Sequence, residues 1–292
     1  MKFLARFGPA GKPEDYKGAM EKLPFYLKEE GLNALEYQAV RGVKISQESA
    51  QQLGKNAAEA DIWLTIHGPY YINLSSENKD TISASKQRLI ESLKAAQWMG
   101  AHAVVFHPGY YGSYTPEEAL KMCISAMKEV VEEAKNLGIA KVHLAPETTG
   151  KTTQVGGLDE IIEMCLEVEN VIPAIDWAHI HAREQGSLNT INDYALVLDK
   201  LESRLGAEYV KNLHCHFSKI EFGKGGEKEH HSLDEKEYGP DFRLLAKVLV
   251  ERGIEPVVIS ESPILDKDAI KMKAIFEEIQ ESSKKKSKRR SK

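Results

Sequence analysis

The sequence has few of the features that mark secreted, membrane-spanning or nucleotide-binding proteins. Its three cysteines form no CxxC or other pair pattern, which argues against a disulfide framework and a cysteine zinc site. No run approaches the ~20 apolar residues of a membrane span. The first residues soon become charged, so we expect no signal peptide. No GxGxxG or GxxxxGKS/T motif follows an apolar run, which argues against a dinucleotide or P-loop enzyme. These absences predict a reduced, cytoplasmic protein.

The composition fits one large folded domain with a basic end. The 292 residues suit a single α/β barrel, and a hydrophobic content of 42% is enough for a sizeable core. Seven of the 39 lysines and arginines lie in residues 284–292, which leaves 32 basic against 44 acidic residues in the rest of the chain. We therefore predict a barrel domain at residues 1–283 and a basic, disordered tail at 284–292. Such a tail either contacts polyanions or only aids solubility.

Short apolar runs alternate with amphipathic segments along the chain. The runs are β-branched or aromatic and end at Gly, Pro or charges, which predicts strands at 3–7, 33–38, 62–67, 103–107, 141–146, 171–176, 209–216 and 256–261. Helical spacing and capping residues predict helices near 13–30, 46–59, 79–99, 115–137, 157–168, 190–204, 240–252 and 267–282. The glycine-rich segment 223–231 is expected to be a loop. This alternation predicts a single-domain α/β fold, the (β/α)8 TIM barrel.

Most of the predicted strands end at a histidine or a carboxylate. These residues are His67, His107, Glu147, Asp176, His214 and Glu261, with His179 just beyond Asp176 and His230 in the glycine-rich segment. Imidazoles and carboxylates bind borderline divalent metals, and the carboxyl ends of barrel strands converge on one axis. The series therefore predicts a polynuclear metal centre. We expect His102 and His143, which lie away from the strand ends, to be structural, and His181 to lie beside the ligands or at the surface.

The order and spacing of these residues resemble the endonuclease IV family of apurinic/apyrimidinic (AP) endonucleases, which are xylose isomerase-like TIM barrels. The resemblance rests on HxxYxINL at 67–74, FHPG at 106–109, the glutamate of PETTG, the Asp-x-x-His pair and the last-strand glutamate. It covers nearly the whole chain. It implies three zinc ions, with Mn²⁺ as a possible substitute. The first would be held by His67, His107 and Glu147, the second by Glu147, Asp176, His214 and Glu261, and the third by His179 and His230.

One departure from the family concerns the third ion. The family usually has an aspartate two residues before the histidine that matches His230, whereas this chain has Lys228. A protonated lysine cannot bind zinc. A shift of the loop would allow Glu227 or Glu229 to replace the aspartate. The chain is therefore expected to be a divergent member with an altered third site.

A second departure leaves the strand-7 ligand open. The family's HxNDxK run appears here as His214-Cys-His216-Phe-Ser-Lys219, without the Asn and Asp. His214 and His216 are two residues apart and share one face of a strand. Either histidine could therefore be the ligand, with His214 taken first.

The resemblance implies a zinc-dependent AP endonuclease of DNA repair, a monomer that hydrolyses the phosphodiester 5′ to an abasic site in double-stranded DNA. Metal coordination would lower the pKa of the attacking water, so no protein nucleophile is needed. We expect Glu147 and Glu261 to be catalytic by orienting this water. Arg41, Tyr70 and Tyr71 follow strands 2 and 3, where the family inserts side chains into the duplex.

Two other functions are compatible with parts of the pattern. A sugar isomerase or epimerase of the same superfamily would use the glutamates of strands 5 and 8, the strand-6 aspartate and the strand-7 histidine around a single metal. The additional imidazoles His67, His107, His179 and His230 favour the nuclease, because one ion has no use for so many ligands. A non-enzymatic metal or nucleic-acid binder is the third alternative.

Overall fold

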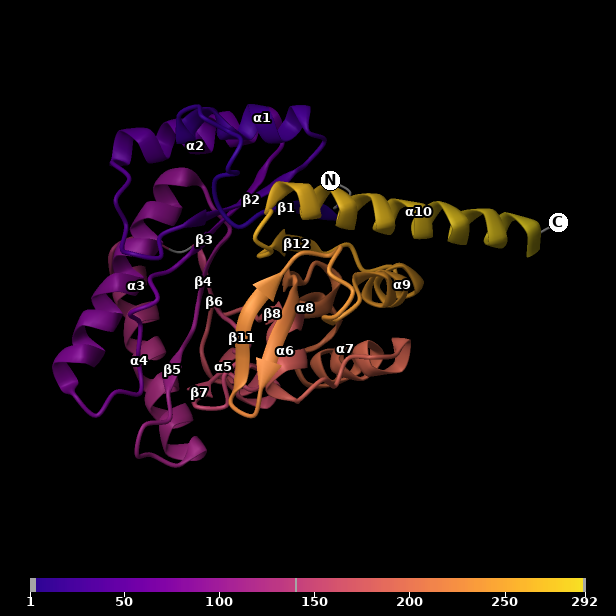
Figure 1. Ribbon diagram of the computed structural model, residues 1–292. Helices are drawn as coiled ribbons and strands as arrows, with labels where there is room; N and C mark the ends of the chain where they lie inside the picture. Colours follow the sequence, from indigo (N-terminus) through magenta and orange to yellow (C-terminus); the bar gives the residue numbers. More distant parts are fainter. Residues whose placement is uncertain (1–3, 140, 291–292) are drawn as a thin grey trace.

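A computed structural model describes residues 4–139 and 141–290, and these residues form a closed barrel of parallel strands surrounded by helices (Figure 1). The barrel strands are β1 (Arg6–Pro9), β2 (Ala34–Gln38), β3 (Trp63–His67), β4 (Ala103–Phe106), β6 (His143–Pro146), β8 (Ala174–Asp176), β9 (His214–Phe217) and β12 (Val257–Ser260). They pair in two parallel sheets, β1-β12-β9-β8 and β2-β3-β4-β6. Parallel bridges from Ala10 to Glu36 and from Glu147 to Ala174 join the sheets at both seams. The predicted single-domain TIM barrel is confirmed.

The helices cover the outside of the barrel and bury their apolar faces against it. They are η1 (Met20–Lys22), α1 (Leu23–Glu29), α2 (Gln47–Ala60), α3 (Lys79–Met99), α4 (Pro116–Asn136), α5 (Leu158–Glu167), α6 (Trp177–Arg183), α7 (Ile191–Leu205), α8 (Ala207–Lys211), α9 (Phe242–Arg252) and α10 (Asp266–Arg290). Local sequence sets several of their ends. In α4 the Thr115 hydroxyl and the Glu118 carboxylate each accept a backbone N–H, which forms a capping box. None of the helices in the described ranges is both long and apolar enough to cross a membrane.

Some predicted boundaries are wrong for identifiable reasons. The predicted strand 209–216 begins in the helix α8, because Tyr209 and Val210 belong to a helical turn that buries only Val210. The predicted helix 13–30 is helical only from Met20 onward, after a segment that contains Pro13 and Gly18. The last helix continues to Arg290, so the described part of the predicted tail extends α10, which projects past α9 (Figure 1). The predicted tail residues 291–292 lie outside the described residues.

Two β-ladders outside the barrel stand over its carboxyl end. The pair β5 (Gly109–Tyr110) and β7 (Gln154–Val155) is antiparallel, as is the hairpin of β10 (Lys219–Gly223) and β11 (Gly226–His231). The prediction of a loop at 223–231 is therefore wrong. Its charged sequence shows no apolar alternation, and the strand exists because β11 pairs with β10 and both pack against α6. Figure 1 shows β11 in front of β8 and α6.

The barrel interior is polar on one side. Side chains of a strand alternate between the interior and the helices, so His214 and His216 of β9 share one face. Both contact Glu36 of β2, which also accepts a hydrogen bond from Thr65 of β3. Because these contacts join strands through the middle of the barrel, all four side chains point inward. The interior thus carries buried ionisable groups that continue up to the mouth.

Candidate metal centre

The predicted ligands gather at the carboxyl ends of the barrel strands. Among the described residues, ligand atoms within 4.8 Å of one another form three groups at the mouth. The first is His67, His107 and Glu147, the second is Glu147, Asp176, His216 and Glu261, and the third is His179, His230 and Glu261. Glu147 belongs to the first two groups and Glu261 to the last two. Shared carboxylates of this kind allow several cations to lie side by side.

Glu147 occupies the middle of the centre. Its Oε2 lies 3.0 Å from His107 Nε2 and 3.2 Å from His67 Nε2. Its Oε1 lies 2.9 Å from His216 Nδ1 and 3.5 Å from His179 Nδ1. Burial by itself raises the pKa of this carboxyl, yet the charges of His216 and His107 hold the pKa well below its usual value. Each oxygen therefore faces a different pair of imidazoles, as a bridging carboxylate requires.

Only one carboxylate oxygen of Asp176 accepts a hydrogen bond from the described residues. Its Oδ1 accepts the backbone N–H of His179 at 2.6 Å and so caps the start of α6. Its Oδ2 is buried and has no hydrogen-bond partner among the described residues. Burial raises the pKa of Asp176 to about 6. The nearest cationic group is His179 Nδ1 at 3.8 Å. A buried carboxylate oxygen that accepts no hydrogen bond is unfavourable unless a cation or a proton binds it, so this atom fits a metal ligand.

Three of the histidines are oriented by a hydrogen bond between their Nδ1 atom and an oxygen outside the ligand groups. Their Nδ1 atoms contact the Gly68 carbonyl (His67, 2.9 Å), the Thr148 carbonyl (His179, 2.9 Å) and the Ser218 hydroxyl (His230, 2.7 Å). The Nε2 of His67 and His179 then faces carboxylates of the centre. Such outer contacts select the tautomer and orient the ring, as they do for histidines that bind metals. The arrangement fits divalent cations.

The structure brings His216, and not His214, to Glu147, Asp176 and Glu261. His216 Nδ1 lies 3.3 Å from Glu261 Oε1. His214 lies deeper, near the start of β9, and contacts Glu36. The order of the two candidates predicted from the sequence is therefore reversed. The reason is that β9 begins at His214 and not at the predicted residue 209, so His214 lies at its amino end, while His216 is paired with Asp176 near the mouth.

Glu227 lies beside two histidines of the third group, near where the sequence predicts a carboxylate in place of the missing aspartate. Its Oε2 lies 3.6 Å from His179 Nε2, and its Oε1 lies 3.9 Å from His230 Nε2. Lys228 points away from the centre and pairs with Glu221 at 2.8 Å. Glu229, the other candidate, is exposed on the outside of the hairpin. The carboxylate nearest these two histidines on the hairpin is therefore that of Glu227, one residue before Lys228.

Two glycines that sequence analysis missed place Glu227 there. The Glu227 N–H donates to the Gly150 carbonyl at 3.1 Å, so the hairpin docks on the loop that follows β6. Gly226 has φ +90°, and a Cβ there would lie 2.0 Å from that same carbonyl oxygen. A Cβ on Gly150 would lie 2.6 Å from the Glu227 Cβ. Close approach of the two backbones therefore requires glycine at both positions. Each glycine is visible in the sequence, but their contact is not.

The mouth opens into a cavity of about 320 Å³ whose wall includes ligands and aromatic residues. It is lined by His67, Tyr70, His107, Tyr110, Lys151, Gln154, His179, Glu227, His230 and Glu261. Tyr70, predicted from the sequence, and Tyr110, which was missed, line this cavity and are 58% and 41% exposed. Tyr71, also predicted, is 62% exposed but is not part of the cavity wall. Burial of the Tyr70 hydroxyl and the nearby Glu261 and Glu147 raise the pKa of Tyr70 to about 12. This side chain therefore stays a hydrogen-bond donor beside the centre.

The other predicted side chains lie around this mouth or away from it. Arg41 is exposed on the loop after β2, which adjoins the Tyr70 loop through a hydrogen bond from Tyr70 N–H to the Val40 carbonyl. His181 accepts the Leu188 N–H through Nδ1 and belongs to none of the ligand groups found in the described part of the chain. The rings of His102 and His143 lie with their centroids 4.9 Å apart and their planes tilted by 54°, at the opposite end of the barrel.

Sequence comparison identifies the family. Residues 25–284 match the family described as xylose isomerase-like TIM barrel. The chain belongs to this family. It is 36% identical to a Methanocaldococcus jannaschii protein named "Uncharacterized protein MJ0133", over 94% of this chain and 97% of that protein. It is also 28% identical to the "Probable endonuclease 4" of Shouchella clausii, over 58% of this chain. This match spans 56% of that relative, about half its length. The predicted resemblance to endonuclease IV is confirmed by such relatives.

Solved structures of two kinds share the fold. The crystal structure of a D-tagatose 3-epimerase-like protein has a TM-score of 0.71 and 22% identity, and covers 97% of this chain and 99% of its own. The crystal structure of endonuclease IV from Thermus thermophilus has a TM-score of 0.70 and 21% identity, with 95% and 99% covered. At these identities the likeness establishes the fold alone. The choice between the two chemistries depends on the residues at the mouth.

Proposed function

We propose that this xylose isomerase-like barrel is a zinc-dependent AP endonuclease, which hydrolyses the phosphodiester 5′ to an abasic site in double-stranded DNA. The observation that carries the proposal is the sharing of Glu147 and Glu261 among three ligand groups. Phosphodiesterases with several metals use adjacent ions to stabilise both the attacking and the leaving oxygen. The three groups would supply such a row of cations.

Each residue has a definite part in this reaction. His67 and His107 would hold one cation with Glu147, and Asp176 and His216 a second one with Glu147 and Glu261. His179, His230 and Glu227 would hold the third. Bound divalent cations act as Lewis acids and lower the pKa of water toward neutrality. Glu147 and Glu261 face the centre with their oxygens and would accept hydrogen bonds from the attacking water, which orients it. The Tyr70 hydroxyl would donate to a phosphate oxygen.

The rim of the mouth suits DNA with a missing base. The rings of Tyr70 and Tyr110 line the cavity together with the ligands, and Tyr71 follows Tyr70 with its ring exposed, so an aromatic ring could cover an unstacked base step here. Arg41 and Lys151 are exposed cations near the same rim and could pair with backbone phosphates. An abasic nucleotide has lost its stacking, so turning it toward the centre requires less free energy than turning an intact one.

A sugar epimerase is the second candidate, because Glu147, Asp176, His216 and Glu261 alone could hold one metal beside carboxylates. The likeness to the D-tagatose 3-epimerase-like fold fits this function equally well. An epimerase with a single metal gives no role to His67, His107, His179 and His230, although all four lie within the ligand groups. The nuclease accounts for these residues, and the epimerase does not.

The decisive experiment combines metal analysis with one substrate. The purified, zinc-loaded chain should contain several zinc ions and should nick a duplex with one abasic site on the 5′ side of the lesion. Glu147→Gln removes a charge shared by two groups, so it should abolish cleavage while the circular dichroism spectrum is retained. An intact duplex together with a single bound ion and epimerisation of a ketose would overturn the proposal in favour of the second candidate.

A further inference from the structure

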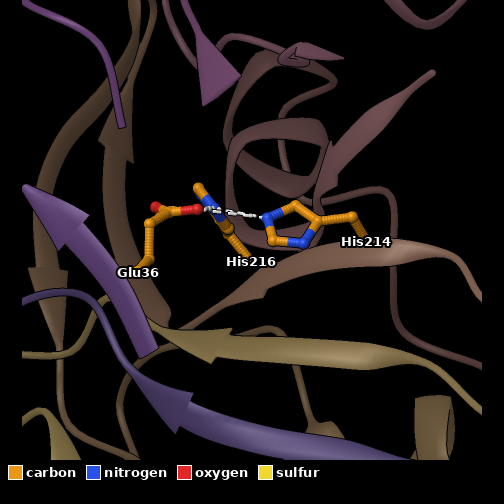
Figure 2. A group of neighbouring side chains, drawn as sticks. All are labelled: Glu36, His214 and His216. Carbon is orange, nitrogen blue, oxygen red and sulfur yellow. Dashed lines mark hydrogen bonds and ion pairs between the residues drawn. The ribbon is translucent and has the colours of Figure 1, made fainter. Parts of the chain in front are cut away.

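A compact cluster of Glu36, His214 and His216 lies inside the barrel below the mouth. Figure 2 shows both rings directed at the Glu36 carboxylate. Glu36 Oε2 lies 3.2 Å from His214 Nε2 and 3.2 Å from His216 Nε2, and the two Nε2 atoms are 3.3 Å apart. Glu36 and His216 are 0% exposed and His214 is 4% exposed. Three donor atoms of metal-binding type therefore form a nearly equilateral triangle in a buried place.

The spacing of these three atoms matches a zinc site. Ligands about 2.0–2.1 Å from a tetrahedral zinc ion lie roughly 3.3–3.4 Å from each other. The three separations here are 3.2, 3.2 and 3.3 Å. The same range occurs at the mouth, where Glu147 Oε2 lies 3.0 and 3.2 Å from His107 and His67. The donor set of two imidazoles and one carboxylate is also one that zinc uses.

Hydrogen bonds alone account less well for this geometry. Hydrogen bonds between a charged imidazole and a carboxylate are typically ~2.7–2.9 Å long, shorter than all of these separations. His216 Nε2 lies 3.1 Å from Glu36 Oε1 and 3.2 Å from Oε2, so it selects neither oxygen. Two N–H groups that both point at Glu36 would also bring like partial charges together at 3.3 Å. A cation between the three atoms removes this conflict.

The surroundings of the cluster favour a bound ion. The Thr65 hydroxyl donates to Glu36 Oε2 at 2.9 Å, and Gln38 Nε2 lies 3.3 Å from Oε1, so the carboxylate is held from outside. His214 also lines a cavity of about 410 Å³ at the opposite end of the barrel, together with His102 and His143. An ion could reach the cluster from this cavity without passing the mouth.

We propose that Glu36, His214 and His216 form a further binding site for a borderline divalent cation such as Zn²⁺, buried below the mouth groups. Its ligands would be Oε2 of Glu36 and the Nε2 atoms of both histidines. His216 faces the mouth with Nδ1, so its ring joins this site to the group of Glu147 and Glu261, and binding of a cation at each ring nitrogen would release the remaining N–H proton to solvent and leave an imidazolate. The ion would link β2 to β9 through the barrel interior and fix the orientation of a mouth ligand. This inference does not depend on the substrate of the mouth.

The test uses the intact chain loaded with Zn²⁺ alone. Crystals of the wild-type protein measured at the zinc absorption edge should show an anomalous peak between Glu36, His214 and His216, besides peaks at the mouth. A map with peaks at the mouth and none in the buried triangle would overturn the proposal. This measurement needs no variant and so does not depend on how a variant folds.

Two histidine variants give an independent check by metal counting after exhaustive dialysis. His214→Asn should bind about one zinc ion fewer per chain than wild type, because it removes one of three ligands. His143→Asn is the matched control, since His143 lines the same cavity but belongs to no ligand group among the described residues. It should retain the wild-type zinc count. Equal counts in wild type and a folded His214→Asn variant would contradict the buried site.

Discussion

Oε2 of Glu227 lies 3.6 Å from Nε2 of His179, although one residue belongs to a hairpin and the other to a short helix after β8. The hairpin carries His230 of the third group and places Glu227 beside it, while Lys228 between them turns outward to Glu221. We propose that Glu227 takes the part that the aspartate has in the family.

Glu227→Gln tests this proposal. The amide is similar in shape but lacks the charge, so the affinity of the third cation should fall by more than the roughly 10- to 100-fold typical of outer partners. Cleavage of abasic duplex should fall with it. The measurements are the zinc content per chain and the rate of duplex cleavage, with wild type and variant at the same free zinc concentration. Lys228→Ala is the control and should behave as wild type, because that side chain is exposed and paired outside the centre. A larger effect of Lys228→Ala would refute the assignment of Glu227.

Ser218→Ala should weaken the third cation without removing a ligand. The Ser218 hydroxyl contacts His230 Nδ1 at 2.7 Å and so orients the ring. Loss of such an outer partner lowers metal affinity by about 10- to 100-fold. A zinc titration with a competing chelator measures the change. Ser113→Ala, which removes an exposed hydroxyl bound to Glu77, should leave the affinity unchanged. An unchanged affinity in Ser218→Ala would show that the ring is held by other contacts.

The metal-free protein should become less stable as the pH rises from about 6.5 to about 9. Burial lowers the pKa of His67 and His179, but Glu147 and Asp176 respectively outweigh it and raise each pKa to about 9. The folded state therefore keeps protons that the unfolded state loses near pH 6.5, so this stability is complete below 6.5 and disappears by 9. Urea unfolding of chelator-treated protein at both pH values measures it. Zinc should suppress the decline, because it binds the deprotonated rings. Stability that rises over this range would contradict the prediction.

Tyr71→Ala should weaken binding of abasic duplex. The ring is 62% exposed on the residue that follows Tyr70 of the cavity wall, and loss of one aromatic stacking contact costs about 1–3 kcal/mol. Fluorescence anisotropy at one fixed salt concentration, with a metal-free sample to prevent cleavage, measures the affinity. Tyr209→Ala is the matched control, because Tyr209 lines the cavity at the opposite end of the barrel. Equal affinities for wild type and Tyr71→Ala would exclude this ring from the DNA contact.

The sequence predicts much of the barrel and most of the residues at its mouth. Most barrel strands lie in short apolar runs, and a parallel strand must present its last residue at the same end as its neighbours. His67, His107, Glu147, Asp176 and Glu261 could therefore be assigned to one centre from their positions alone. The helix α3 was predicted with its observed bounds, Lys79–Met99, because its apolar spacing and its terminal Gly100 are local signals.

The remaining features depend on contacts between distant segments. Whether His214 or His216 reaches the mouth depends on the length of β9, which its pairing with β8 and β12 determines. The hairpin that presents Glu227 has no apolar alternation and is stabilised by α6 and by the loop at Gly150. Glu36 lies on a strand without other metal-type residues. Its contact with the two histidines of β9 could therefore be recognised only from the three-dimensional structure.

The hairpin β10–β11 is not one of the barrel strands, yet it carries Glu227 and His230. The ligands Glu147, Asp176 and Glu261 lie at the ends of barrel strands and are held by the architecture itself. Insertions or deletions in the hairpin could therefore delete one ion-binding group and leave the others in place. If the three groups bind ions as proposed, a change in the length of this one hairpin would alter the number of ions without disturbing the barrel strands.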